Sequence, residues 1–181
     1  MIQVASAMIY HGFAKPVDFF PDRERQTSAD RSFFVSIAAG VPLKSFSDIL
    51  GPSAAIIRAM PNTPAAIGKG MVAIKANSHV DARDADFVET LLKTCGETAT
   101  LSDEAMMDAV TAISSSGPAY LFYFIECLIE AAKSFGFDEV LATKLATQTV
   151  YGAASMAAVG AMRRQSCAAR CEPKWHHGGG T

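Results

Sequence analysis

A long apolar stretch interrupted by a short polar break constrains the fold of this chain more than any other feature. Apolar residues recur at helical spacing through residues 103–113, residues 114–117 read Ser-Ser-Ser-Gly, and a second apolar segment follows. Serine side chains compete for backbone hydrogen bonds, and Pro118 suits the first turn of a helix because its nitrogen has no hydrogen to donate. The pattern predicts a helix, a break and a second helix that ends at Gly136.

The second predicted helix is apolar on nearly every side. Its polar residues Glu126, Glu130 and Lys133 form one narrow stripe. A helix of this kind is buried on most of its surface, and a chain of 181 residues offers little to cover it. We therefore expect a subunit interface along this helix, with a core helix of a single domain as the alternative.

Composition excludes several classes of function. Half of the residues are hydrophobic and the formal net charge is −2, which is typical of a globular chain that does not bind nucleic acid. No uninterrupted apolar run reaches the roughly 18 residues of a membrane span, and the N-terminus lacks the pattern of a secretory signal. The pair Cys167 and Cys171, followed by two histidines, does not have the spacing of a zinc site. We expect no metal, no membrane partner and a reducing, cytoplasmic location, with mitochondria left open.

The part of the chain before the break alternates strand and helix patterns. Strands are predicted at residues 32–39, 55–60, 71–75 and 97–101, and Asp81 is expected to cap the longer helix. Ser45 or Ser47 is expected to cap a short helix that ends at residue 50. After residue 102 the pattern is helical throughout, with a third helix that Asp138 caps. The fold class is therefore α/β, a parallel sheet followed by an all-helical domain.

Three segments carry a resemblance to a known family. They are FVSIAAGV at residues 34–41, RAMPNTPAAIGKG at residues 58–70 and DAVTAISSSGPAY at residues 108–120. In order and spacing they resemble the pyrroline-5-carboxylate reductases, with Ser115 where that family usually has Gly. The resemblance spans residues 27–161. It implies the C-terminal half of a Rossmann-like sheet at residues 27–101 and a helical dimerisation and substrate domain at residues 102–161.

Both ends of the chain depart from the family. Residues 1–26 form an unmatched arm, and the G-x-G-x-x-G motif that holds a dinucleotide is absent from the sequence. Lys15 and Pro16 resemble a family loop that lies against the cofactor, or match it by chance. Residues 162–181 form an aberrant tail, whose codons read one nucleotide later permit the family's S-P-x-G-T-T loop. The expectation is a reading-frame error there, with a splice variant or chance as alternatives.

Candidate cofactor ligands follow two of the predicted strands. Ligands bind at the carboxyl ends of parallel strands, which favours Ile37, Ala38 and Ala39, with simple strand packing as the alternative. Asn62 and Thr63 lie in the next turn. Their side chains can bond a ligand or satisfy their own turn.

Candidate substrate ligands lie around the polar break. Glu104 matches an acidic position that lies near the substrate in the family, and its alternative role is a charge favoured at a helix N-terminus. Ser114, Ser115, Ser116 and Gly117 precede a helix, so we expect free N–H groups for a substrate carboxylate, with a structural kink as the alternative. No residue stands out as a general acid or base, because hydride transfer requires mainly orientation.

The resemblance implies an enzyme of proline biosynthesis. The expected activity is reduction of 1-pyrroline-5-carboxylate to L-proline with NADP or NAD as cofactor, in a homodimer or larger homo-oligomer, impaired here by the departures at both ends. The alternative is a non-catalytic truncated product that dimerises through its helical half. A third interpretation keeps the fold with a different imine or keto substrate, against which the MPNTP and SGPAY segments argue.

Overall fold

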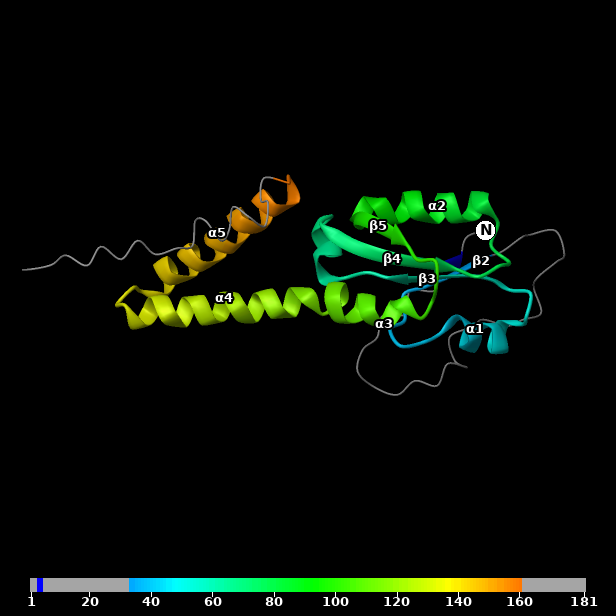
Figure 1. Ribbon diagram of the computed structural model, residues 1–181, viewed down its shortest axis with the longest axis horizontal. Coiled ribbons are helices and arrows are strands. Elements are labelled where there is room, and N and C mark those ends of the chain that lie inside the picture. Colours follow the sequence, from blue (N-terminus) through cyan, green and yellow to red (C-terminus); the bar gives the residue numbers. More distant parts are fainter. Residues whose placement is uncertain (1–2, 5–32, 161–181) are drawn as a thin grey trace, which may run out of the picture. The chain divides into compact units, whose positions relative to one another are not determined.

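The computed structural model describes residues 3–4 and 33–160, and these form two compact units (Figure 1). The first unit runs to Ala119 and the second begins at Tyr120. The first unit therefore extends further along the chain than the predicted boundary after residue 101. It includes the short helical segment that follows the sheet, for reasons given by the contacts described below.

A five-stranded sheet forms the centre of the first unit. Its strands lie in chain order: β1 (Gln3–Val4), β2 (Phe33–Ser36), β3 (Ala55–Met60), β4 (Gly70–Ala76) and β5 (Gly96–Thr100). The pairs β1–β2, β2–β3 and β4–β5 are parallel, but β3 and β4 are antiparallel. The prediction of an all-parallel sheet is thus wrong for this pair. The short connection, a 3₁₀ turn η3 (Thr63–Ile67), cannot make the crossover that parallel neighbours need.

Two helices flank the sheet, and their caps have different origins. In α2 (Ala82–Leu92) the Asp81 carboxylate accepts a hydrogen bond from the Asp84 N–H at 2.8 Å, which confirms the predicted cap. The short turn η4 (Lys93–Cys95) then leads into β5. In α1 (Leu43–Leu50) the predicted serine caps are wrong, because the Ser47 hydroxyl donates to the Leu43 carbonyl instead. The first N–H of α1 is satisfied by a carboxylate far along the chain, as described below.

The two faces of the sheet differ in polarity. Figure 1 shows α2 over one face, and α1 and α3 (Met106–Val110) over the other. The α2 face is apolar, with Val88 of α2 packed on the buried side chains Phe33, Val35, Ile57, Ala59, Val72 and Ile74. On the opposite face Met107 packs against Met60 and Ala73. Strand alternation places Arg58 on that second face, between Ile57 and Ala59 in sequence.

The predicted break is a change of helix type. The π-helical segment η5 (Thr111–Ser115) joins α3 to α4 (Gly117–Ser134), and the Ser116 N–H donates to the Thr111 carbonyl at 2.9 Å. An extra residue per turn is therefore accommodated without loss of backbone hydrogen bonding at that point. Such π segments are rare and often occur at functional sites.

The second unit consists of most of α4 and of α5 (Glu139–Ala158). Gly136, which follows α4, adopts a positive φ of 93°. The Asp138 carboxylate accepts from the Leu141 N–H at 2.9 Å and so caps the start of α5. Both predicted caps are therefore confirmed. Lys133 forms ion pairs of 2.9 Å with Glu130 and Glu139, which ties the end of α4 to the start of α5. No residue of α4 is buried, although most are apolar.

By length and composition the helical stretch Met106–Ser134 is apolar enough to cross a membrane, although core helices of other proteins satisfy the same criterion. The stretch contains no uninterrupted apolar run of that length, because the polar residues of the π segment and of the Glu126 stripe divide it.

Candidate functional site

A polar row crosses the α3 face of the sheet. Ser36 of β2 lies beside Arg58 of β3, which lies opposite Lys75 of β4. Directly paired residues on neighbouring strands point to the same face. Ser36 is the last residue of β2, and Lys75 lies where β5 ends, so two loops leave the sheet at this row. These loops carry the predicted cofactor residues and Glu104, respectively.

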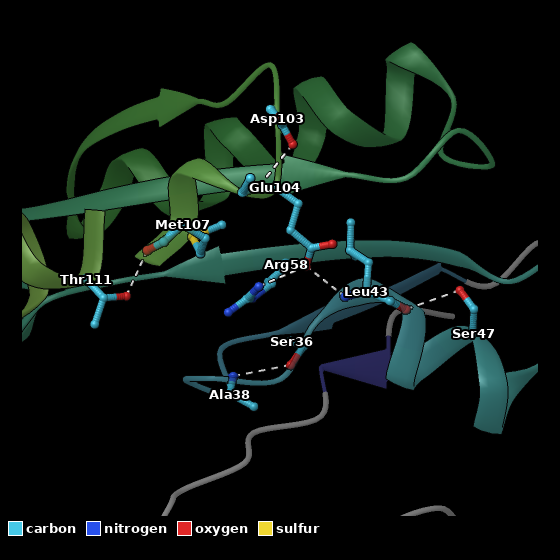
Figure 2. A network of polar contacts seen from close by, with 10 residues as sticks. Ser36, Ala38, Leu43, Ser47, Arg58, Asp103, Glu104, Met107 and Thr111 are labelled. Atoms are coloured by element: carbon cyan, nitrogen blue, oxygen red, sulfur yellow. Dashed lines mark hydrogen bonds and ion pairs between the residues drawn. The ribbon is translucent and has the colours of Figure 1, made fainter. Parts of the chain in front are cut away.

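Glu104 lies four residues after the end of β5, and its side chain contacts Arg58 in the middle of this row. Its Oε1 lies 2.8 Å from Nη1 of Arg58 and also accepts a hydrogen bond of 2.8 Å from the Leu43 N–H (Figure 2). One oxygen thus joins three segments: strand β3, the first residue of α1 and the start of the helical region. Glu104 caps α1 from a distance, rather than its own helix.

Arg58 is buried far more deeply than its charge would favour. Its relative exposure is 4%, and its Nε has no hydrogen-bond partner within the described part of the chain. Burying an unpaired guanidinium is costly, so the Glu104 carboxylate compensates for much of this burial. The neighbouring Lys75 reaches outward, where its Nζ donates to the Ser102 carbonyl at 2.6 Å.

The loop after β2 holds the predicted cofactor residues Ile37, Ala38 and Ala39. The strand ends at Ser36, and Ile37 and Ala39 are exposed, so these residues do not pack as part of the strand. The Ala38 N–H donates to the Ser36 hydroxyl at 3.2 Å, which shapes the loop (Figure 2). Gly40 has a positive φ of 72°, and a side chain there would meet no described residue within 4 Å, so this backbone is open on that side.

Asn62 uses both ends of its side-chain amide. Its Oδ1 accepts from the Met71 N–H at 2.9 Å, and its Nδ2 donates to the Ser114 carbonyl at 3.1 Å. The side chain therefore joins the turn after β3 to the start of β4 and to the π segment. Thr63 begins η3 and is exposed. The alternative, in which the Asn62 side chain bonds only within its own turn, does not describe these contacts, because its partner Ser114 lies 52 residues away.

The predicted substrate residues lie together at the junction of η5 and α4. The Ser116 N–H is already bonded to Thr111, so the prediction of a free N–H is wrong for this residue, because the helix continues through the break. The Ser115 hydroxyl differs: its oxygen is buried and has no hydrogen-bond partner among the described residues. Gly117 has open space where a side chain would begin.

Three anchors attach the segment between Glu104 and Ser114 to the sheet. Glu104 is held by Arg58, Met107 is fully buried against Met60, and the Ser114 carbonyl is held by Asn62. These contacts explain why this helical segment belongs to the first compact unit. Through Arg58 and Asn62, strand β3 and its turn thus contact both the segment with the predicted substrate residues and Glu104, which bonds the end of the loop after β2.

Lys15 and Pro16 lie outside the described residues. Within residues 33–160, no group of three or more His, Cys, Asp or Glu side chains is placed to hold a metal ion. The residue that the sequence analysis missed is Arg58, although a lone charge inside the strand sequence AIIRAM is a detectable signal.

Comparison with known proteins places these features in a family. Residues 104–173 match the family described as pyrroline-5-carboxylate reductase dimerisation. The pyrroline-5-carboxylate reductase of Pseudomonas aeruginosa is 42% identical over 123 residues, which cover 68% of this chain and 45% of that protein. That of Escherichia coli K12 is 42% identical over 125 residues, which cover 69% of this chain and 46% of that protein.

Solved structures agree with the sequence matches. A pyrroline-5-carboxylate reductase from Coxiella burnetii superimposes with a TM-score of 0.68 at 37% identity, over 72% of this chain and 48% of that one. A Plasmodium falciparum pyrroline carboxylate reductase, solved with NADP bound, gives 0.71 at 31% identity, over 77% of this chain and 56% of that one. This chain therefore spans about half the length of the curated relatives it matches, and it belongs to the pyrroline-5-carboxylate reductase family.

Proposed function

We propose that this chain acts in the reduction of 1-pyrroline-5-carboxylate to L-proline with NADPH or NADH as cofactor. One observation carries the proposal: β3 and its turn hold both the exposed loop after β2 and the π segment, through Arg58 and Asn62. The relatives named above are pyrroline-5-carboxylate reductases, and one was solved with NADP bound. The proposed location is the cytoplasm.

The loop after β2 and Asn62 are assigned to the cofactor. The small side chains of Ala38 and Ala39, and the open space at Gly40, fit a nicotinamide placed against the backbone. When bound, the cofactor supplies the hydride that adds to the imine carbon while a proton joins the nitrogen. The contribution of these residues is to orient the cofactor, with Asn62 acting through the turn that it braces. Lys15 and Pro16 remain candidates for the same role.

The π segment is assigned to the substrate. The Ser115 hydroxyl is buried and has no partner among residues 33–160, so it is available to donate to a carboxylate oxygen of 1-pyrroline-5-carboxylate. Ser114, Ser116 and Gly117 shape the same junction, and Glu104 lies at the other end of the anchored segment. Because a buried hydroxyl without a partner is unfavourable, a ligand that accepts from it would remove that cost.

A second copy of the chain is the proposed partner of the helical region. The helix α4 has no buried residue, and an apolar helix is ordinarily covered. The match to the family's dimerisation segment favours a homodimer or larger homo-oligomer.

The test is a titration of the purified full chain with NADPH, followed by assay of NADPH oxidation and L-proline formation. We expect binding at micromolar NADPH and turnover that Ser115→Ala reduces, with Ser134→Ala, an exposed serine of α4, as the control. A protein that self-associates but does not bind NADPH would instead support the alternative, a non-catalytic chain that dimerises.

A further inference from the structure

We propose that Arg58, Glu104 and the Leu43 amide form a positioning clasp, which fixes the loop after β2 relative to the helical segment that leads to the π segment. The inference deepens the proposed function and rests on it for the identity of the two ligands. It assigns Glu104 to positioning rather than to direct contact with substrate. Arg58, which the sequence analysis did not select, becomes part of the site.

One carboxylate oxygen of Glu104 makes both contacts of the clasp. Oε1 of Glu104 takes both contacts of 2.8 Å, one from Nη1 of Arg58 and one from the Leu43 N–H. Leu43 is the residue at which the loop after β2 ends and α1 begins. The loop is therefore held at both ends, by strand β2 at Ser36 and by Glu104 at Leu43.

The two side chains of the pair differ in burial. The Arg58 side chain is 5% exposed and that of Glu104 is 27% exposed. A partly buried pair that meets at one oxygen has few alternative arrangements, and such pairs are weak sources of stability but can specify one geometry. In the register of β2 and β3, Arg58 is the partner of Ser36, the residue after which the loop begins.

The clasp is also connected to the predicted substrate residues. Glu104 begins the anchored segment whose far end, Ser114, is held by Asn62. Arg58 lies in β3 and Asn62 lies in the turn that follows it. Strand β3 and its turn therefore hold both ends of the segment. The clasp thereby sets the separation between the loop for the nicotinamide and the Ser115 hydroxyl, which decides whether hydride transfer is geometrically productive.

The test compares two double variants of the full chain, because Glu104→Ala alone would leave the Arg58 charge buried and unpaired. Arg58→Met with Glu104→Gln removes both charges and keeps an oxygen that accepts from Leu43. Arg58→Met with Glu104→Leu removes the charges and that acceptor. Hydrogen exchange is followed at the Leu43 amide. The Asn77 and Leu101 amides, bonded to the Ile56 and Ile74 carbonyls, serve as internal controls.

The clasp predicts at least roughly tenfold faster exchange at Leu43 in the Leu variant than in the Gln variant, with the two control amides unchanged. Equal exchange at Leu43 in the two variants would overturn the proposal. This measurement needs no ligand, so it decides the clasp even if the chain does not bind NADPH.

A second arm assays the same two double variants to separate positioning from substrate contact. Neither leaves a buried arginine charge, and only Arg58→Met with Glu104→Gln keeps the oxygen that accepts from the Leu43 N–H. Arg58→Met with Glu104→Leu should therefore raise KM for NADPH as well as for the imine by at least about threefold relative to the Gln double variant. Equal KM and kcat values in the two double variants would overturn the positioning role.

Discussion

The two compact units of this chain achieve order by different means. The first unit has a closed interior, in which Ile56, Ile57, Val72 and Met107 are almost fully buried and a buried arginine has a partner. The second unit has long helices with almost no interior, because α4 has no buried residue and α5 buries only Ala142 and Ala146. Apolar residues are plentiful in both, so composition does not separate them.

The difference shows where each unit obtains its stability. Burial of apolar side chains is the main favourable term in folding, and the first unit obtains it from its own residues. The second unit leaves many large apolar side chains exposed, among them Leu121, Phe122, Phe124 and Tyr151. Exposed apolar surface of this kind marks a protein interface. Substitutions in the first unit should therefore change stability at any protein concentration, whereas substitutions on α4 should act mainly through association.

The largest expected effect follows from an arginine on α4. Tyr120, Phe124, Cys127 and Ala131 recur at heptad spacing and are exposed. Phe124→Arg should weaken self-association by about 5 kcal/mol or more, because it removes an aromatic side chain from the interface and buries an unpaired charge there. Sedimentation equilibrium measures the change, with Glu126→Lys on the polar stripe of the same helix as the control. Equal dissociation constants for the two variants would mean that this stripe is not the interface.

The next effect concerns two adjacent methionines. Met107 is fully buried against Met60 and Ala73, whereas Met106 is 49% exposed. Met107→Ala should lower the free energy of unfolding by about 2–5 kcal/mol, and Met106→Ala should change it by less than about 0.5 kcal/mol. Denaturant unfolding of the sheet unit provides the measurement. A similar loss for both would remove the claim that α3 is anchored through its buried face.

A third prediction compares two asparagines whose side chains each bond separate segments. Asn62 bonds Met71 and Ser114, whereas Asn77 bonds Ile56, Ala54 and His79. Replacement of either by Ala should cost about 1–3 kcal/mol, because buried groups lose their partners. Only Asn62→Ala should also speed hydrogen exchange in the π segment. If Asn77→Ala had the same effect there, the tie to Ser114 would not be what holds that segment.

A smaller effect, of opposite sign, is expected at Ser115. Its hydroxyl is buried without a partner among the described residues, so Ser115→Ala should raise the free energy of unfolding by about 1 kcal/mol in the absence of ligand. Thermal unfolding with and without L-proline measures this. We expect the stabilisation by L-proline to be smaller in the variant. A variant that is less stable than the parent chain would show that the hydroxyl has a structural partner.

Local features of the first unit were predictable, and long-range ones were not. The strand at residues 55–60 and the caps Asp81 and Asp138 depend on side chains within a few residues, and the structure confirms them. The bond from Arg58 to Glu104 joins residues 46 apart, and that from Leu43 to Glu104 joins residues 61 apart. No periodicity in the sequence encodes such a separation, so Arg58 was missed.

The polar break shows a different limit of prediction. Serine and glycine indicated an interruption of the helix, but the backbone there continues as a π-helical segment. The Asn62 side chain holds this segment by its hydrogen bond to the Ser114 carbonyl. The antiparallel pairing of β3 and β4 was missed for a related reason. It follows from the length of their connection, which the strand patterns do not express. The sites of the expected cofactor and substrate residues remain predictions that the proposed binding experiments address.

The smallest predicted effects distinguish the two units by pH. In the first unit, bonding to Lys93 and then to the Thr98 hydroxyl lowers the pKa of Glu89, so this contribution to stability is lost as pH falls through the folded-state pKa. In the second, bonding to Glu130 and then to Glu139 raises the pKa of Lys133, so its contribution is present at neutral pH and is lost as pH rises through the folded-state pKa. Both groups are exposed, so each effect is small and screened by salt.

Hydrogen exchange in α2 should therefore quicken slightly at acid pH in the parent chain relative to Glu89→Gln. Exchange at the α4–α5 turn should quicken slightly at alkaline pH relative to Lys133→Gln. If each change were instead shared by both units, the units would unfold as one, and the contrast between a unit closed on itself and one that relies on a partner would fail.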